Sequence, residues 1–364
     1  MPAIEFQSVS KTYGGQKAVD DLSLAVEPGR FTVLCGPPKS GKSTIFRLLV
    51  GLERPDAGRI LANGEDLTDL PAGARRIGYV PQSFALYPHL SVFENIAYPL
   101  RLARTPAAEV ASRVDRATAM LSIGHLVKKT PDQLSGGEKQ RVAVARGLLS
   151  SDSVFVLDDP LVGLDYKLRE RLMDDLKHLC EDLKATFFYA TSDSLEALTM
   201  AEDLVVLDDG RLVEKADVLD LYREPRFART MELIGFPRAN VWPGSARGGI
   251  VTVGGLRFAA PAGTPDGAVL VGVRPEDVRL AGSDETGVPA TVRIVEHLGS
   301  EIVAYLENGA MQVTAAYPSE RAGLPEIDTS LNMVIDPERM LVFDKGTGRA
   351  IGRGSPMQEG RAHG

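Results

Sequence analysis

The chain has 364 residues, of which 44% are hydrophobic and 25% charged, the balance of an ordinary globular protein. Its formal net charge of −8 at pH 7 argues against a nucleic-acid binder, which normally shows a basic footprint. Cys35 and Cys180 lie far apart without metal-ligand spacing, so no disulfide framework is expected. The N-terminus lacks the pattern of a secretory signal, and no apolar run approaches the roughly 18 residues that cross a bilayer. Any membrane role is therefore expected to depend on docking onto another protein.

The first part of the chain predicts strands alternating with helices. Short apolar runs punctuated by Gly and Pro predict strands at 4–9, 22–26 and 31–35. A Gly-rich turn at 36–41 then leads into a periodic helix over 42–51, and helical periodicity dominates from about 91 to 150. Between about 153 and 213, strands again alternate with helices. This pattern predicts parallel strands with helical crossovers, buried on both faces.

The composition changes near 224–240, where two prolines occur and the periodicity is lost. Beyond it come short strands with frequent Gly and Pro, which predict a separate small β-barrel or sandwich. We therefore expect a first domain over 1–235, with a helical subdomain at about 88–150. A second domain is expected over 236–353, followed by a disordered tail over 354–364.

The motif with the most direct chemical meaning lies between a predicted buried strand and a helix. Backbone N–H groups of such a Gly-rich loop, and of the helix that follows it, can point at phosphate oxygens. Lys42 can reach the β- and γ-phosphates of a nucleotide, and Ser43 can ligate Mg²⁺. The sequence thus predicts a nucleotide-binding P-loop made of Gly36, Pro37, Pro38, Lys39, Ser40, Gly41, Lys42, Ser43 and Thr44.

A second motif, LSGGE at 134–138, narrows the class of protein. Ser135, Gly136 and Gly137 precede a predicted helix, and the strand that follows ends at Asp158, where Mg²⁺ would lie. Together with the P-loop, this order resembles the ABC ATPases, whose signature motif has this sequence. The resemblance implies an α/β P-loop NTPase fold, with a RecA-like core plus a helical subdomain. It also implies an enzyme that hydrolyses ATP with Mg²⁺ as its cofactor.

Further positions match the same family in the same order. By resemblance, Tyr13 stacks on adenine and Gln82 contacts both Mg²⁺ and the attacking water. The stretch 161–165, ending at Asp165, is similar to the D-loop. Residues 85–96 resemble the segment of importer ATPases that receives a helix of the transmembrane subunit.

The C-terminal region indicates which subclass of ABC ATPases the chain resembles. Stretches at 272–277 and 296–301 resemble the OB-like regulatory (TOBE) domain of sugar-importer ATPases of the maltose and glycerol-phosphate type. The likeness, over roughly residues 3–350, implies a peripheral subunit at the cytoplasmic face of the inner membrane. Its implied partners are two transmembrane permease subunits, a second ATP-binding subunit and, indirectly, a periplasmic solute-binding protein, but no nucleic acid. The implied solute is a sugar, a polyol such as glycerol, or glycerol-phosphate.

Three departures from the family pattern concern hydrolysis. Asp159 replaces the glutamate that serves as general base for water, and misplacement on the order of 1 Å can cost about 10²-fold in rate. Ser192 replaces the switch histidine and is too short to repeat its contact with the γ-phosphate. Pro38 removes one N–H from the loop, and Lys39 adds a positive charge where glycine is usual. MgATP binding is therefore expected to survive better than the activation of water.

Two dimer arrangements are compatible with this pattern. ABC ATPases of this family bind each ATP between two subunits. One subunit contributes its Walker motifs, which are the P-loop and the strand that ends at the Mg²⁺ aspartate, and the other contributes its signature motif. Weakened Walker-side chemistry beside an intact signature favours the degenerate half of a heterodimer. The alternatives are a homodimer in which Asp159 is a slow base, and a non-hydrolysing regulatory subunit. A DNA-repair or translation ATPase is disfavoured by the single nucleotide domain and the acidic charge.

Overall fold

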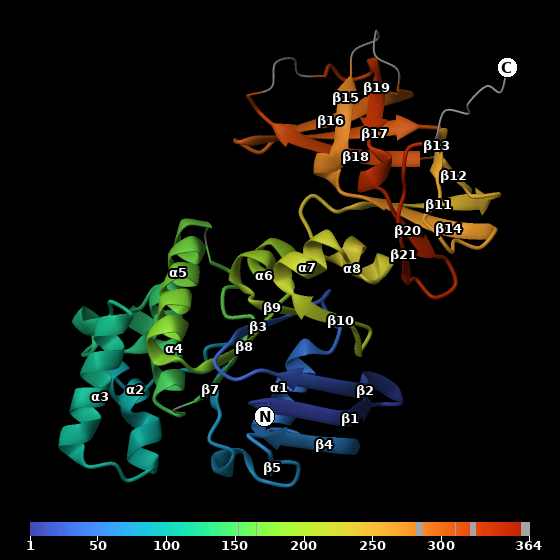
Figure 1. The fold of residues 1–364 in the computed structure, drawn as a ribbon. Helices are drawn as coiled ribbons and strands as arrows, with labels where there is room; N and C mark the ends of the chain where they lie inside the picture. Colours follow the sequence, from blue (N-terminus) through green and yellow to red (C-terminus); the bar gives the residue numbers. More distant parts are fainter. Residues whose placement is uncertain (152, 165, 282–286, 310, 321–324, 358–364) are drawn as a thin grey trace, which may run out of the picture. The chain divides into compact units, whose positions relative to one another are not determined.

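A computed structural model describes residues 1–151, 153–164, 166–281, 287–309, 311–320 and 325–357. Contacts divide the chain into two compact units, Met1–Val218 and Leu219–Gly364 (Figure 1). This division falls earlier than the boundary between 235 and 236 that the composition predicts. The difference arises because the segment before 236 is bound to the second unit, as shown below.

The first unit is built on two sheets. A six-stranded sheet has the order β10-β9-β3-β8-β7-β6, and all its neighbouring pairs are parallel except that of β9 and β10. Every residue of β3, β7 and β8 is buried, as expected for parallel strands covered on both faces. An antiparallel sheet has the order β2-β1-β4-β5. The strands are β1 (Ile4–Tyr13), β2 (Gln16–Val26), β3 (Phe31–Cys35), β4 (Ala57–Ala62), β5 (Glu65–Asp66), β6 (Gly78–Val80), β7 (Val154–Asp158), β8 (Thr186–Thr191), β9 (Asp203–Asp208) and β10 (Arg211–Asp217).

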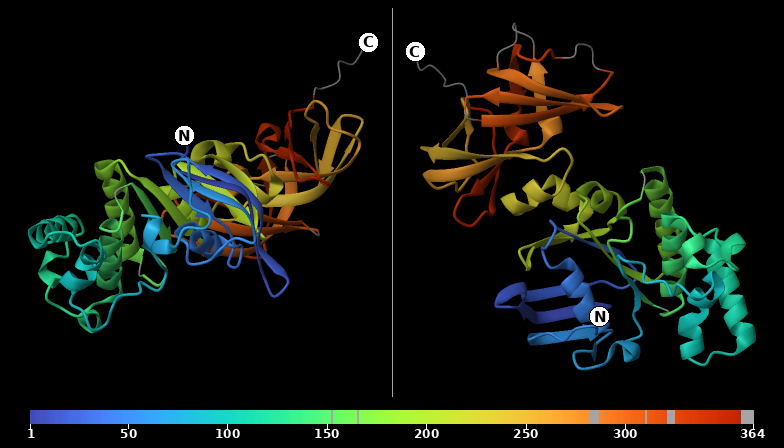
Figure 2. Two further views of the ribbon diagram at one scale, coloured as in Figure 1. Left: turned by 90° about the horizontal axis from the view of Figure 1, so that it is seen from below. Right: turned by 180° about the vertical axis from the view of Figure 1, so that it is seen from behind.

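Three helices of this unit begin at recognisable capping residues. Ser91, Ser135 and Asp193 each accept a backbone N–H of the first turn, at the starts of α2, α4 and α6. In α4, the side chain of Glu138 also accepts a hydrogen bond from the backbone N–H of Ser135, which completes a capping box. The helices are α1 (Lys42–Val50), α2 (Val92–Leu102), α3 (Ala107–Met120), α4 (Gly136–Leu148), α5 (Tyr166–Leu183) and α6 (Ser194–Met200). Figure 2 shows α2 and α3 to one side of β1, β2 and β4, within the range predicted for a helical subdomain.

The described part of the second unit is mainly β, in agreement with the sequence. Two antiparallel sheets, β13-β12-β11-β14-β20-β21 and β15-β19-β16-β17-β18, share one core. Val251 and Val271 enter that core from the first sheet, and Val292 and Val313 from the second. The elements are α7 (Val218–Arg223), α8 (Ala228–Leu233), β11 (Asn240–Arg247), β12 (Ile250–Val253), β13 (Leu256–Ala259), β14 (Gly267–Val273), β15 (Val278–Ala281), β16 (Val288–His297), β17 (Glu301–Asn308), β18 (Met311–Pro318), β19 (Ser330–Ile335), β20 (Leu341–Asp344) and β21 (Ala350–Arg353).

The sequence predicts no helix at 224–240, where its periodicity is lost, and this is wrong for the middle part. Helix α8 occupies 228–233 there, and its Ala228 and Met231 are buried in a cluster with Leu341 and Phe343. A helix this short gives too few turns for its apolar period to be recognised. The tail predicted from 354 is also wrong at its start, because Gly354 donates to the carbonyl of Met340 and Ser355 pairs with Ala259. The rest of that prediction, from 358 on, lies outside the described residues.

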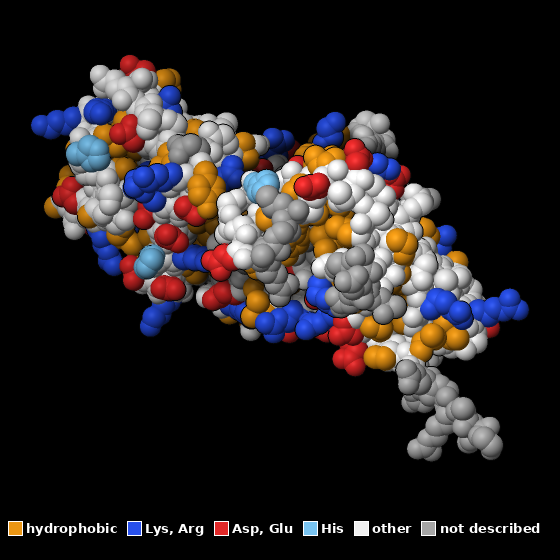
Figure 3. All heavy atoms as spheres, turned by 90° about the horizontal axis from the view of Figure 1, so that it is seen from above, with side chains coloured by type: hydrophobic (Ala, Val, Ile, Leu, Met, Phe, Trp, Pro, Cys, Tyr) orange, Lys and Arg blue, Asp and Glu red, His pale blue; other side chains and the backbone are white. Residues whose placement is uncertain are grey.

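Two further observations concern the helices and the distribution of charge on the surface. Among the described residues, none of the helices combines the length and apolarity that a membrane crossing requires. On the face drawn in Figure 3, side chains of Lys and Arg are interspersed with those of Asp and Glu.

A buried arginine ties the segment before 236 to the second unit. Arg274, 6% exposed, donates to the carbonyls of Met231, Ile234 and Tyr222, the last at 2.9 Å. Its guanidinium also lies 4.0 Å from the centre of the Tyr222 ring. These hydrogen bonds explain why the segment before 236 belongs to the second, mainly β unit.

We expect Arg274→Met to lower the free energy of unfolding of the second unit by about 2–4 kcal/mol, because three carbonyl groups lose a charged donor. The fluorescence of Trp242, the single tryptophan of the chain, reports on this unit alone, since Trp242 is buried in β11. The matched control is Arg293→Met, because Arg293 is exposed in its ion pairs with Glu307 and Asp328. Denaturant midpoints that agree between the two variants would contradict the anchoring role.

Candidate functional site

The predicted P-loop connects the end of β3 to the start of α1, and two of its glycines are required by close approach. A Cβ on Gly36 would lie 2.1 Å from the carbonyl oxygen of Leu207. Gly41 has φ +102°, and a Cβ there would lie 2.3 Å from the carbonyl oxygen of Ala18. Only glycine fits both positions, so the loop is held tightly against β2 and β9.

The loop wraps around the ammonium group of Lys42. This side chain is 7% exposed, and its Nζ donates to the carbonyls of Gly36 at 2.7 Å and Pro37 at 2.9 Å. The hydroxyl of Ser40, also buried, lies 3.5 Å from the same Nζ. Burial lowers the pKa of Lys42, while the nearby Asp159 and Asp158 carboxylates raise it. The loop thus holds a cation at the place where the sequence predicts phosphate oxygens.

Pro38 and Lys39 form the outer part of the loop. Both line a cavity of about 370 Å³. Lys39 has φ +69°, so this position, where glycine is usual in the family, adopts the left-handed backbone that glycine prefers. A side chain in this conformation costs on the order of 1 kcal/mol. Pro38 has no N–H to offer the cavity.

Ser43 and Asp158 form a pair of oxygen ligands beside the loop. Ser43 Oγ donates to Asp158 Oδ1 at 2.9 Å, although 115 positions separate the two residues. Tyr79, on β6, donates to the other carboxylate oxygen at 3.3 Å. Burial raises the pKa of Asp158, which is 4% exposed. Hydroxyl and carboxylate oxygens are the ligands that Mg²⁺ prefers, so these residues fit the predicted metal.

The cavity gathers most of the side chains that the sequence singles out. It is lined by Ala18, Pro38, Lys39, Gly41, Lys42, Ser43, Thr44, Gln82, Asp158, Asp159 and Ser192. The P-loop, the predicted Q-loop glutamine, the end of β7 and the residue after β8 therefore meet at one edge of the parallel sheet. Ligands of open α/β sheets bind at this carboxyl edge of the strands.

Asp159 occupies a strained position in the cavity wall. It has φ +48°, and its N–H donates to the carbonyl of Ala190 at 2.9 Å. Burial raises its pKa to about 6, with Lys42 acting in the opposite direction and Asp158 adding to the rise. A carboxylate with this pKa is mostly ionised at pH 7 and can accept a proton.

A second buried carboxylate lies behind this wall and was not predicted from the sequence. Glu196 on α6 is 5% exposed and accepts a hydrogen bond from the hydroxyl of Tyr189, which is fully buried in β8. Burial raises the pKa of Glu196 to about 7, and the charge of Asp159 raises it further. The signal in the sequence was a tyrosine inside an apolar strand, since a buried phenol requires a partner.

Other predicted residues lie outside the cavity lining. Tyr13 ends β1 and is 44% exposed, with Lys11 Nζ 5.6 Å from its ring centre. Ser135, Gly136 and Gly137 form the start of α4. Gly36, Pro37 and Ser40 contact Lys42 but do not line the cavity itself. Asp165, predicted in the D-loop, is outside the described residues.

Comparisons with family models agree with this division of the chain. A model described as ABC transporter matches residues 19–162. A TOBE domain model matches residues 271–343, and a CysA C-terminal regulatory domain model matches residues 240–280.

Curated relatives align over most of the chain. The sn-glycerol-3-phosphate import ATP-binding protein UgpC of Cereibacter sphaeroides is 37% identical over 354 residues, 96% of this chain and 100% of its own. The trehalose/maltose import ATP-binding protein MalK of Thermococcus litoralis is 35% identical over 376 residues, 96% and 100% of the two chains. The spermidine/putrescine import ATP-binding protein PotA of Rubrobacter xylanophilus is 39% identical over 311 residues, 82% and 81% of the two chains.

Solved structures resemble the nucleotide-binding part. A dimeric ATP-binding cassette in a post-hydrolysis state, bound to ADP and Pi, aligns with a TM-score of 0.55 at 30% identity. The alignment covers 59% of this chain and 98% of that one. The cbiO1 subunit from Clostridium perfringens aligns with a TM-score of 0.56 at 26% identity, over 61% and 91% of the two chains.

The parallel sheet, the P-loop around Lys42 and the Ser43–Asp158 pair define a P-loop NTPase. Since its relatives exceed 30% identity over most of the chain, the protein belongs to the ABC transporter family. It is an ATPase of that family, with a TOBE domain at its C-terminal side, as the sequence predicts.

The buried carboxylates predict how stability depends on pH. The pKa of Glu196 is about 7 in the folded protein against 4.5 as the ordinary value, so the folded state binds more protons between these limits. Stability must then fall as the pH rises through this range. Glu196→Gln keeps an acceptor for Tyr189 but removes the charge. We expect it to stabilise the first unit by on the order of 3 kcal/mol at pH 8 and by little at pH 4.

Calorimetric unfolding at the two pH values measures this difference. The control is the same substitution at Glu27, which is exposed. A gain of stability at pH 4 as large as at pH 8 would show that the carboxylate charge is not the cause.

Proposed function

We propose that the chain is the ATP-binding subunit of an importer for a small solute: a sugar, a polyol such as glycerol, or glycerol-phosphate. The observation that carries this proposal is the near full-length alignment, through both units, with the glycerol-phosphate and trehalose/maltose import ATP-binding proteins. On this proposal the chain lies at the cytoplasmic face of the membrane. Its partners are two permease subunits, a second ATP-binding subunit and, through the permeases, a solute-binding protein.

The cavity supports a defined role for each group. Lys42 exchanges the carbonyls of Gly36 and Pro37 for the β- and γ-phosphate oxygens, while backbone N–H groups at the start of α1 donate to the same phosphates. Ser43 and Asp158 hold Mg²⁺, with Gln82 beside them. When bound, Mg²⁺ neutralises charge on the phosphates. Tyr13 stacks on the adenine, which its exposed ring permits.

The signature residues support the proposal of a dimer. Ser135, Gly136 and Gly137 start a capped helix, and none of them lines the cavity that holds the P-loop. A Cβ on Gly136 would meet nothing within 4 Å, so the surface at this helix start is open to a ligand from outside. These residues therefore serve the nucleotide of the partner subunit, and the similar cassette solved as a dimer supports such an arrangement.

The finer part of the proposal concerns turnover. Asp159 and Ser192 both line the cavity, and both are shorter than the glutamate and histidine that ABC ATPases use. The raised pKa of Asp159 suits a base, so its weakness lies in reach and not in charge. We infer that this site binds MgATP but hydrolyses it slowly, and that the partner is a different, fully active ATPase.

The test is the ATP turnover of the purified chain beside that of an Asp159→Glu, Ser192→His double variant. We expect slow turnover for the parent and a gain of about tenfold or more for the double variant, because water and γ-phosphate regain groups of the correct length. Both proteins are expected to bind MgATP with similar affinity.

The double variant carrying Lys42→Ala in addition is the control for contaminating ATPases and should lose turnover. Parent turnover on the order of 1 s⁻¹ or faster would overturn the slow-site proposal. A homodimer with a working Asp159 would then be the better account. Absence of MgATP binding in both proteins would contradict the importer role itself.

A further inference from the structure

The second unit contains a cavity of about 1120 Å³, larger than the one at the P-loop. It lies among β15, β18, β19 and the short 3₁₀ turns at Pro275–Asp277 and Pro337–Arg339, and all of its lining residues belong to this unit. Its volume is ample for a small molecule. The ATPase chemistry described above uses none of these residues.

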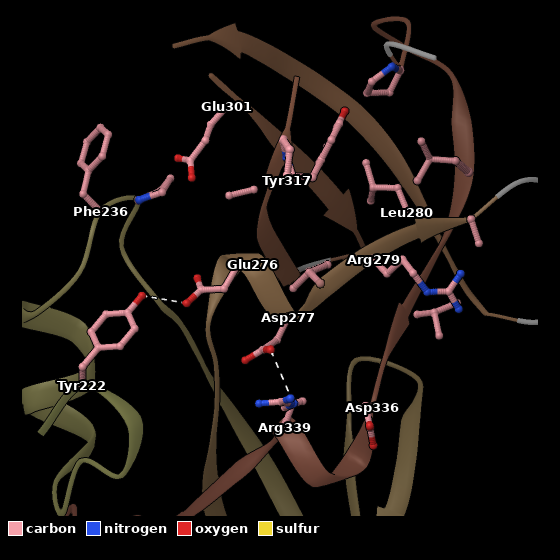
Figure 4. Close-up of a pocket in the computed structure, with 18 residues that line it drawn as sticks. Tyr222, Phe236, Glu276, Asp277, Arg279, Leu280, Glu301, Tyr317, Asp336 and Arg339 are labelled. Atoms are coloured by element: carbon pink, nitrogen blue, oxygen red, sulfur yellow. Dashed lines mark hydrogen bonds and ion pairs between the residues drawn. The ribbon is translucent and has the colours of Figure 1, made fainter. Parts of the chain in front are cut away.

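Charges of both signs line the cavity. Glu276, Asp277, Glu301 and Asp336 supply carboxylates, and Arg279 and Arg339 supply guanidinium groups. Asp277 lies 3.8 Å from Arg339, and Glu276 accepts from the hydroxyl of Tyr222 at 2.7 Å. Figure 4 shows Glu276 and Glu301 toward Tyr222 and Phe236, with Leu280 and Arg279 on the opposite side.

The balance of these groups restricts the ligand. An anion such as a phosphate would face four carboxylates, and a simple cation would face the guanidinium groups of Arg279 and Arg339. A neutral molecule avoids both penalties. The carboxylates provide many acceptors and Arg339 provides donors, which together suit a ligand with several hydroxyl groups.

Apolar surface alternates with these polar groups. The ring of Phe236 lines the cavity and is 60% exposed, and Leu280 and Val334 add aliphatic surface. The hydroxyl of Tyr317, another lining residue, is buried without a hydrogen-bond partner among the described residues. Because that oxygen is enclosed, Tyr317, which is only partly buried, contributes its aromatic ring to the lining and no hydrogen bond.

We propose that this cavity is a binding site for a neutral, hydroxyl-rich small molecule, a polyol or a sugar. Carboxylates of Glu276 and Glu301 accept from its hydroxyl groups, and Arg339 donates to its oxygens. Phe236 covers its C–H surface, as aromatic rings do in sites that recognise such molecules.

Isothermal titration of the full chain, without nucleotide, tests this site separately from the ATPase. The probes are glycerol and maltose as neutral polyols, with glycerol-phosphate and spermidine as anionic and cationic comparators. We expect a neutral probe to bind at concentrations up to about 10 mM. Glu301→Gln and Phe236→Ala should each weaken this binding by about tenfold.

The matched control is Glu232→Gln, because Glu232 has the same charge and lies in the same unit but pairs with Arg229 outside the cavity. Trp242 fluorescence verifies that each variant is folded. Binding of only the anionic or only the cationic probe overturns the proposal, as does absence of binding by every probe. Binding of a neutral probe whose affinity is unchanged by Glu301→Gln and Phe236→Ala overturns it as well. Each of these outcomes leaves the proposed ATP-binding role intact, since no nucleotide is present.

Discussion

Lys42 brings a positive charge into a place with little access to water, and much of the first unit is arranged around that charge. A buried ammonium is costly unless hydrogen bonds and opposite charges replace its hydration. The carbonyls of Gly36 and Pro37 supply the hydrogen bonds, which requires the backbone to fold back over the side chain. That path is open only because Gly36 and Gly41 have no Cβ to meet the carbonyls of β9 and β2.

The carboxylates near this charge have raised pKa values because they are buried, and the charge opposes part of that rise for two of them. Asp158, Asp159 and Glu196 are all buried enough that their pKa values rise, so the site concentrates acid groups that each resist ionisation. Lys42 offsets part of this cost for the two aspartates. A nucleotide brings further negative charge, which Lys42, the exposed Lys39 and a metal between Ser43 and Asp158 can balance. Phosphate binding thus involves Lys42, which also holds the loop together, whereas Asp159 and Ser192 line the cavity and form no hydrogen bond with that lysine in the described part of the chain.

The local parts of this arrangement could be predicted from the sequence. The strand, Gly-rich loop and helix around Lys42 follow one another within 31–50, and the pairing of Ser43 with Asp158 follows from the rule that parallel strands end at one edge. Tyr79 and Glu196 could not be predicted, because their roles depend on which buried atoms face each other across β6, β7, β8 and α6. Helix α8 was missed for a related reason: its burial against Leu341 and Phe343 depends on residues more than 100 positions later.

The second unit also contains a buried cation, Arg274, whose charge is stabilised by main-chain carbonyls as that of Lys42 is. Arg274 lies in the stretch whose resemblance to a regulatory domain was evident from the sequence, yet resemblance alone gave it no physical role. In the structure its guanidinium binds main-chain carbonyls at three positions and covers the ring of Tyr222. Because carbonyl oxygens are available whatever the side chains are, such an anchor fixes the path of a segment without constraining its sequence. A buried cation therefore shapes the backbone in both units: Lys42 closes a loop that can receive phosphate, and Arg274 holds a helical segment beside a β fold.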